Sequence, residues 1–264
     1  MVITNKAKKI IRKAKSNAFL FEQLVKRDFN QKYKRTVLGM AWSVLSPLLH
    51  LLVMKVVFTN FFGRDAEYYT TYLFSGNIVM AFYKEATKNG MSSLMKNSKI
   101  IQKINVPKYL FLLSRNISAL VNFGLTLIVY FVFCFFDGIP FGFRFLLLLY
   151  PICCLVIMNI GIGMILSALY VFFRDIQYLY EVFLTLLTYL SAIFYQVDRF
   201  PAQYRQLFLL NPVYVNIKYF RTVVIDGIVP SVQFHLLGAF YAIFFLVIGC
   251  WMYKKYNHEF VYYL

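Results

Sequence analysis

The chain has 264 residues, of which 60% are hydrophobic and 20% are aromatic. A water-soluble domain of this composition would have too few polar residues to cover its surface, so the composition excludes an ordinary soluble protein. The formal net charge is +17, which in a soluble protein would suggest a nucleic-acid partner. In a membrane protein the position of basic residues matters more than their total. We therefore predict a polytopic membrane protein without a nucleic-acid partner.

Long apolar runs predict an all-α membrane protein with six transmembrane helices. A helix rises about 1.5 Å per residue and a bilayer core is about 30 Å thick, so a span needs roughly 20 apolar residues. The runs that suit this length are 37–58, 69–83, 116–136, 145–173, 179–195 and 234–253. The second run is short and carries Gly76 and Asn77, whereas the fourth is long enough to tilt.

The basic segment before the first span predicts an amphipathic helix in the cytoplasmic interface. Four apolar residues fall near one helical face, namely Ala18, Phe21, Val25 and Phe29. Two roles are open for this helix: a basic anchor attracted to anionic lipid, and a receiver for an anionic substrate headgroup.

The distribution of Lys and Arg predicts the orientation of the chain. The loops and tails on one side of the predicted spans carry 21 of them, and those on the other side carry 6. Because basic loops resist translocation, the side with 21 is expected to be cytoplasmic. Both termini lie on that side in this prediction.

The chain contains no G-x-x-x-x-G-K-[ST] phosphate-binding loop, so it cannot be assigned an ATPase site of its own. Glu181 is the only acidic residue well inside a predicted span, and Arg174, two helical turns earlier on the same face, is a plausible partner. Ion-coupled carriers often have several paired acidic residues in their spans. The sequence therefore favours an energy source on another subunit.

No metal site or catalytic cluster is predicted. The four cysteines fall in predicted spans without the repeated spacing of metal ligands, and small apolar packing residues are the favoured interpretation: Cys134, Cys153, Cys154 and Cys250. A membrane-embedded glycosyltransferase, an alternative from another functional class, would need an acidic catalytic or metal-binding cluster in its loops.

Two segments between spans carry further signals. In residues 90–104, Gly90 is predicted to break the chain before a short helix whose apolar face includes Met91, Leu94, Met95 and Ile101. This face could dock in a groove of a partner or rest on the membrane surface. In residues 196–233, Asn211-Pro212 and Asp226-Gly227 predict breaks between two short helices that dip into or lie on the outer leaflet and could form an outer gate.

Four motifs together resemble one family. They are LVKRDFNQKYKRTVLGMAWSVLSPLL at 24–49, IIQKINVPKYLFLLSRNI at 100–117, the pair Arg174-Asp175, and LLNPVYVNIKYFR at 209–221. In this order they resemble the transmembrane subunit of type-2 ABC transporters that export O-antigen, capsule, rhamnan or wall teichoic acid. The resemblance runs nearly from end to end but does not separate these glycan classes.

The resemblance implies an organisation for the chain. Residues 1–36 would be a cytoplasmic gate region and residues 37–264 a six-span permease domain with re-entrant outer helices. Met91, Leu94, Met95 and Ile101 would belong to the helix that couples to the ATPase, and Arg174 and Asp175 to a second contact with it. Family members work as a homodimer with two ATPase subunits. ATP and Mg would bind to those partners, and this chain would bind no cofactor.

The resemblance also implies a substrate, a lipid-linked polysaccharide moved across the bacterial cytoplasmic membrane. Its pyrophosphate could be held by Arg27, Lys32 or Arg35 at the entrance. Aromatic rings offer apolar faces on which sugars can slide, and the channel candidates are Trp42, Tyr72, Phe82, Tyr83, Tyr170, Tyr189 and Tyr195. A drug or a lipid as the cargo of the same fold is a second alternative.

Overall fold

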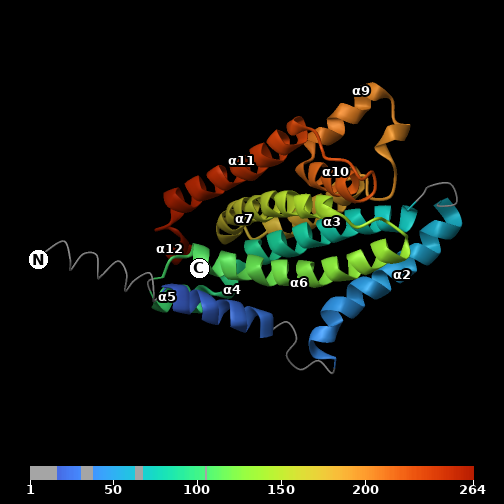
Figure 1. The fold of residues 1–264 in the computed structure, drawn as a ribbon. Coiled ribbons are helices and arrows are strands. Elements are labelled where there is room, and N and C mark those ends of the chain that lie inside the picture. Colours follow the sequence, from blue (N-terminus) through green and yellow to red (C-terminus); the bar gives the residue numbers. More distant parts are fainter. Residues whose placement is uncertain (1–16, 31–37, 63–67, 105) are drawn as a thin grey trace, which may run out of the picture.

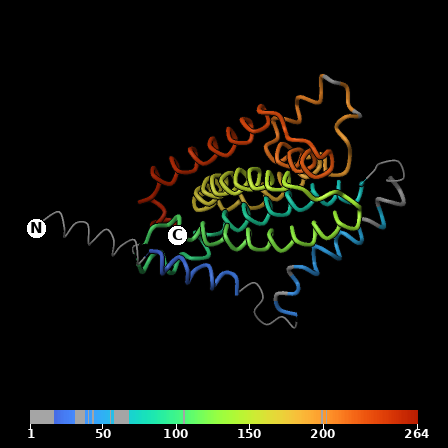
Figure 2. The backbone as a smooth tube through the Cα atoms, viewed as in Figure 1, coloured from blue at the N-terminus to red at the C-terminus, as the bar shows by residue number. Residues whose placement is uncertain are grey.

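The structure is a computed structural model that describes residues 17–30, 38–62, 68–104 and 106–264. Every regular element in these ranges is a helix, which confirms that the chain is all-α; the interfacial and re-entrant positions of its helices in the membrane stay predictions. Figures 1 and 2 show an elongated bundle in which α3, α6 and α7 run side by side, with α11 over α7 and α2 set at an angle. After helix 17–30, the helices are η1 (Gly39–Ala41), α2 (Trp42–Phe62), α3 (Tyr69–Met91), α4 (Ser93–Lys96), α5 (Ser98–Lys103), α6 (Tyr109–Phe136), η2 (Phe143–Leu148), α7 (Leu149–Phe172), α8 (Ile176–Leu190), η3 (Val197–Arg199), α9 (Ala202–Arg205), η4 (Gln206–Leu210), α10 (Pro212–Val224), α11 (Val232–Tyr256) and α12 (Phe260–Tyr263).

Three helices in the described part of the chain are long and apolar enough to cross a membrane. They are Tyr109–Phe136, Phe143–Phe172 and Val232–Tyr256, which coincide with the third, fourth and sixth predicted runs. Residues Val44–Met54 of α2 and Ile176–Leu190 form shorter apolar helices. α3 is long, but its second half carries Lys84, Glu85 and Lys88. Six spans therefore remain a prediction.

The expected break at Gly90 is wrong, because α3 continues through this residue to Met91. A Cβ atom at Gly90 would lie 3.0 Å from the Cα of Gly163 on α7. The missing side chain therefore allows the backbones of α3 and α7 to approach closely. The chain leaves α3 at Ser92, two residues later than predicted.

Glycines also bring α7 and α11 together. A Cβ atom at Gly161 would lie 2.4 Å from the backbone nitrogen of Leu246, and one at Gly249 would lie 2.6 Å from the carbonyl oxygen of Gly161. Neither backbone could move away without separating the helices. Small residues at helix contacts are the usual way in which transmembrane helices pack tightly.

A hydrophobic cluster joins the short helices at one end of the bundle. Its buried members come from helix 17–30, α4, α5, α6, α7, α11 and α12, and include Leu24, Leu94, Ile101, Phe111 and Phe260. The C-terminus lies at this end, beside α4 and α5 (Figure 1). The cluster therefore fixes helix 17–30 and the segment after α3 to the body of the bundle.

The opposite end is built from α8, η3, α9, η4 and α10. α8 ends at Leu190, earlier than the predicted 195, and Ala192 has a left-handed backbone with φ of 50°. The predicted break at Asn211-Pro212 is confirmed, because the Asn211 side chain caps α10 by accepting hydrogen bonds from the backbone N–H groups of Val213 and Tyr214.

Candidate functional site

Two adjoining cavities form a groove along α2, α3 and α6. The larger has a volume of about 680 Å³ and the smaller of about 400 Å³. Glu85 and Asn122 line both, so the cavities meet at these residues. The larger cavity is lined by residues of four helices, namely Trp42, Ser46, Pro47, His50 and Leu51 of α2, Phe74, Asn77, Ile78, Met80, Ala81, Phe82, Lys84 and Glu85 of α3, Asn122, Phe123 and Thr126 of α6, and Thr188 of α8.

The larger cavity combines aromatic rings with planar polar groups. The Phe82 ring stacks on that of Phe123, with their centroids 4.7 Å apart. Beside them, Nδ2 of Asn122 donates a hydrogen bond of 2.8 Å to Oε1 of Glu85. Ring faces next to amide and carboxylate groups match the apolar faces and hydroxyl groups of sugar rings. The groove is therefore suited to a polar, ring-containing chain.

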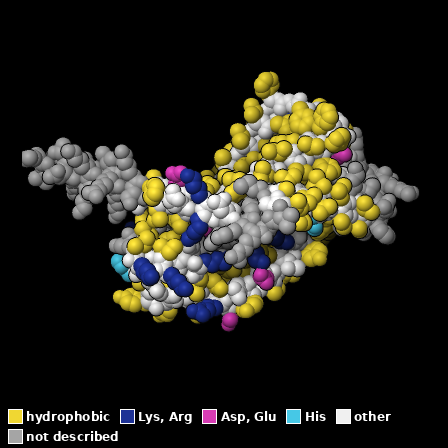
Figure 3. Space-filling view, turned by 90° about the horizontal axis from the view of Figure 1, so that it is seen from below, with side chains coloured by type: hydrophobic (Ala, Val, Ile, Leu, Met, Phe, Trp, Pro, Cys, Tyr) yellow, Lys and Arg dark blue, Asp and Glu magenta, His cyan; other side chains and the backbone are white. Residues whose placement is uncertain are grey.

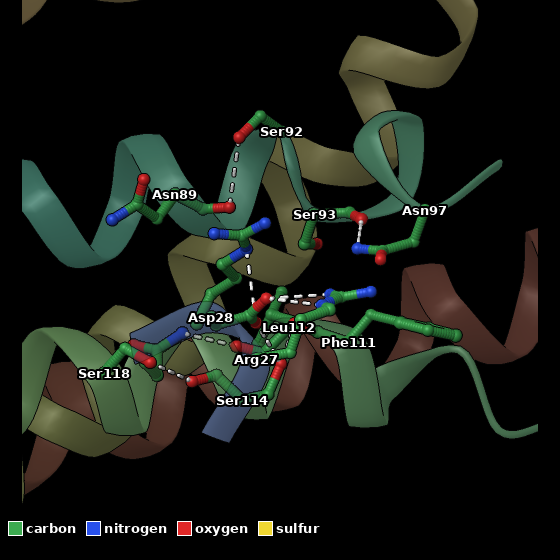
Figure 4. Close-up of polar contacts among 12 residues, drawn as sticks. Arg27, Asp28, Asn89, Ser92, Ser93, Asn97, Phe111, Leu112, Ser114 and Ser118 are labelled. Carbon is green, nitrogen blue, oxygen red and sulfur yellow. Dashed lines mark hydrogen bonds and ion pairs between the residues drawn. The ribbon is translucent and has the colours of Figure 1, made fainter. Parts of the chain in front are cut away.

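A buried carboxylate fixes helix 17–30 beside the smaller cavity (Figure 4). The side chain of Asp28 is fully buried and accepts hydrogen bonds from Nη2 of Arg27 at 2.8 Å and from Oγ of Ser114 on α6 at 2.8 Å. Nε of Arg115 lies 3.4 Å from its second oxygen, at ion-pair distance but outside hydrogen-bond geometry. Two guanidinium groups thus share the Asp28 carboxylate, and the Glu85 carboxylate lines the same cavity, so these two positive and two negative charges balance.

Further basic residues surround this cluster. On the face seen in Figure 3, Lys and Arg side chains gather toward the end that carries α4 and α5, whereas the other half is mainly hydrophobic. Burial lowers the pKa of Lys96; the Arg115 charge lowers it further and Asp28 partly offsets the shift. Lys96 thus adds a positive charge beside the balanced cluster around Asp28.

The structure places the predicted entrance and channel residues in several different environments. Arg27 lies beside the smaller cavity, and Lys32 and Arg35 fall outside the described residues. Of the seven aromatic candidates, Trp42 and Phe82 line the groove. Tyr83 is buried in the core, Tyr72 and Tyr195 lie at the end of the bundle that carries η3, α9 and η4, Tyr189 is exposed on α8, and Tyr170 donates a hydrogen bond to Gln177.

The apolar face expected to meet a partner faces inward instead. Leu94 is 0% exposed and Ile101 6% exposed, both in the cluster that joins the short helices, and Met91 is buried as well. This burial corrects the predicted direction of the face, since these side chains already pack against α6 and its neighbours. Met95 is half-buried, whereas Arg174 and Asp175 are exposed. Glu181 pairs with Lys88, with 2.7 Å between Oε1 and Nζ, and not with Arg174 as expected.

Sequence reasoning missed the polar residues of α3 and α6 that line the groove. Asn77, Lys84, Glu85 and Asn122 come from these two helices. The sequence did indicate them, because a polar side chain within or beside an apolar run usually faces a cavity or another helix. Asp28 was missed because its partners Ser114 and Arg115 lie more than 80 residues away in the sequence.

The family model for "ABC-2 type transporter" matches residues 20–225. The chain belongs to this family. The matched region includes helix 17–30 from residue 20 onward, all the residues that line the groove, and α10. The site described above thus lies inside the part of the chain that defines the family.

Relatives within this family match almost the whole chain. An O-antigen export system permease protein of Klebsiella pneumoniae is 27% identical over 92% of this chain and 95% of its own length. A protein of the same description from Myxococcus xanthus is 24% identical over 81% of this chain and 83% of its own length. A polysialic acid transport protein of Escherichia coli is 24% identical, with coverages of 88% and 92%.

Proposed function

We propose that this chain is the membrane-spanning subunit of an ATP-driven exporter, and that it moves a lipid-linked polysaccharide across the bacterial cytoplasmic membrane. The observation that carries the proposal is the similarity over nearly the whole chain to permeases for O-antigen and polysialic acid. The groove supports it, because its aromatic and planar polar side chains suit sugar rings. These relatives favour a polysaccharide over a drug or a lipid, and transport over glycosyl transfer.

The energy would come from a separate ABC ATPase, present in two copies that bind ATP and Mg. The absence of a phosphate-binding loop from the full sequence supports this division of labour. The permease would be a homodimer, with residues 1–36 as the gate region and residues 37–264 as a six-span domain. Six spans would put both termini on the same side of the membrane, and the excess of Lys and Arg on that side supports the cytoplasm.

The entrance would lie at the smaller cavity. There, Arg27, Arg115 and the nearby Lys96 would attract the pyrophosphate of the lipid carrier. The sugar chain would then follow the groove past Trp42 and Phe82. The exposed side of α4 and α5 and the pair Arg174-Asp175 would contact the ATPase.

Deletion of the gene in its own host tests the function. The expected result is loss of the surface polysaccharide and accumulation of the lipid-linked polymer inside the cell, both reversed by the intact gene. A deletion strain with normal surface polysaccharide would contradict the proposal. Loss of a lipid from the cell surface, or loss of drug resistance, with normal surface polysaccharide would favour a lipid or a drug as the cargo.

A further inference from the structure

Arg221 of α10 is buried at the outer end of the bundle, where three elements meet. It is 7% exposed, and in the described part of the chain no carboxylate lies within ion-pair distance of it. A buried charge is stable only where its hydrogen-bonding groups are satisfied. The hydrogen-bond partners of this guanidinium group therefore show which segments of the chain it joins.

Backbone carbonyls and one hydroxyl take the hydrogen bonds of Arg221. Nη1 donates to the carbonyl of Ala192 at 2.9 Å, and Nη2 donates to the carbonyls of Ile193 and Tyr72, both at 3.2 Å. Nε donates to Oγ of Ser75 at 3.3 Å. One side chain thus links α10 to the residues after α8 and to the first turns of α3. The carbonyls at the end of α8 also carry the negative end of the helix dipole, which stabilises the cation.

The space for the guanidinium group is shaped by two residues of α3. Its central carbon lies 3.4 Å from the centroid of the Tyr72 ring, in a cation–π contact. A Cβ atom at Gly76 would lie 2.9 Å from Nη2 of Arg221. The absence of a side chain at Gly76 therefore leaves room for the guanidinium group.

A second contact ties the beginning of α10 to α8. Nδ2 of Asn211 donates to the carbonyl of Leu190 at 3.2 Å and to Oγ of Ser191 at 2.9 Å, while its Oδ1 caps α10. α10 is thus held to the end of α8 at Asn211 and again at Arg221. Most side chains of α10 are buried as well.

The segment between the end of α8 and Asn211 is more exposed, although Phe208 and Leu209 pack against Ala192, Val197 and Tyr214, and Tyr241 donates to the Leu209 carbonyl at 2.9 Å. In α9 and η4, Tyr204, Leu207 and Leu210 are 49%, 58% and 71% exposed. Segments with few buried contacts open at lower free energy than segments in the core. The outer end therefore has a fixed part and a part that can move.

We propose that Arg221 is a positioning residue that joins α3, the end of α8 and α10 into one rigid unit, against which the α9 and η4 part of the expected outer gate moves during transport. The role in transport rests on the function proposed above. The arrangement of the rigid unit rests on the contacts of Arg221 alone.

The test measures how fast a water-soluble maleimide labels single cysteines in the complete complex with its ATPase. The four native cysteines are replaced by alanine, and the complex is placed in lipid nanodiscs, where both faces are accessible. Cysteine is introduced at Ala192, which is 0% exposed, or at Leu207, which is 58% exposed. In the parent, ATP hydrolysis is expected to change labelling at position 207 and leave position 192 protected.

Arg221→Lys keeps the charge but not the forked donors, so it is expected to increase labelling at position 192 by about tenfold. Gly76→Ala displaces the guanidinium group without removing it and should give a smaller increase. Tyr72→Phe keeps the ring under the guanidinium group but removes the hydroxyl that donates to the carbonyls of Tyr195 at 2.7 Å and Ala192 at 3.4 Å, so it should also give a smaller increase. Arg205→Lys serves as the control, because Arg205 also donates to backbone carbonyls but lies in the exposed segment.

Unchanged labelling at position 192 in both Arg221→Lys and Gly76→Ala would overturn the role of Arg221. If the Arg221→Lys variant does not assemble with the ATPase, labelling of position 192 in Gly76→Ala alone tests the role of Arg221. Equal changes at positions 192 and 207 during ATP hydrolysis would overturn the division into fixed and moving parts. None of these measurements uses a glycan, so failure of the proposed substrate would appear only in the export assay.

Discussion

At the scale of single residues, Asp28 is the carboxylate that fastens helix 17–30 to α6. Asp28→Ala should detach this helix, because two guanidinium groups and the Ser114 hydroxyl lose their common partner. We expect the free energy of unfolding to fall by about 2 kcal/mol. This is less than the cost of breaking a fully buried ion pair, because Arg27 is partly exposed. Limited proteolysis of the membrane-bound chain should show faster cleavage near residues 17–30.

Glu22→Gln is the matched control for this change. Glu22 pairs with Lys26 in the same helix at 2.6 Å, but both side chains are more than half exposed. Its removal should change stability by no more than about 0.5 kcal/mol. Equal cleavage of the two variants would contradict the anchoring role of Asp28.

Trp42 and Phe82 both line the groove but differ in burial. Trp42 is 42% exposed, whereas Phe82 is 2% exposed and stacks on Phe123. Trp42→Ala should reduce export while the amount of protein in the membrane stays normal. Phe82→Ala should also reduce the amount of protein, since truncation of a buried aromatic ring costs about 3 kcal/mol or more. Staining of the surface polysaccharide beside quantification of the protein separates the two effects. Normal export by Trp42→Ala at normal protein level would remove Trp42 from the pathway.

At the scale of elements, α4 and α5 turn their apolar side to the chain, and we propose that their exposed side contacts the ATPase. Ile104→Asp, at a position that is 47% exposed, should reduce copurification of the ATPase without loss of the permease itself. Leu94→Asp should instead destabilise the permease, because the charge would enter a filled cluster. Full copurification with Ile104→Asp would contradict the assignment of the exposed side as the contact.

The contact between α7 and α11 depends on a glycine whose position allows no side chain. Gly161→Ala should lower the melting temperature in detergent, because the new Cβ would lie 2.4 to 2.5 Å from backbone atoms of α11. Gly124→Ala is the matched control on α6, where a Cβ atom meets nothing within 4 Å. Equal melting temperatures for Gly161→Ala and Gly124→Ala would contradict the view that the close contact between α7 and α11 stabilises the protein.

Sequence patterns predicted some elements better than others. α6, α7 and α11 were found because their apolar runs are long and uninterrupted. The length of α3 was missed, since Gly90 is a helix breaker in water but a packing residue where two helices cross closely. The apolar face of Leu94 and Ile101 was recognised from its spacing, but spacing alone does not reveal what covers a face.

At the scale of the whole molecule, four motifs in order predicted the family, and the family model confirms it. The site was predictable only in part. Trp42 and Phe82 were named in advance and line the groove, and Arg27 pairs with Asp28, which lines it, whereas Glu85 and Asn122 emerge only when α3 and α6 lie side by side. Contacts between distant segments of this kind cannot be derived from local periodicity.

Reconstituted transport tests the central claim most directly. The purified chain and its ATPase are placed in proteoliposomes together with the lipid-linked polysaccharide, and polymer that has crossed the membrane is measured by its accessibility to a glycosidase. We predict movement that requires ATP, the ATPase and this chain together. Vigorous ATP hydrolysis by the complex with no movement of the polymer, in the same vesicles, would contradict the claim that this chain exports polysaccharide.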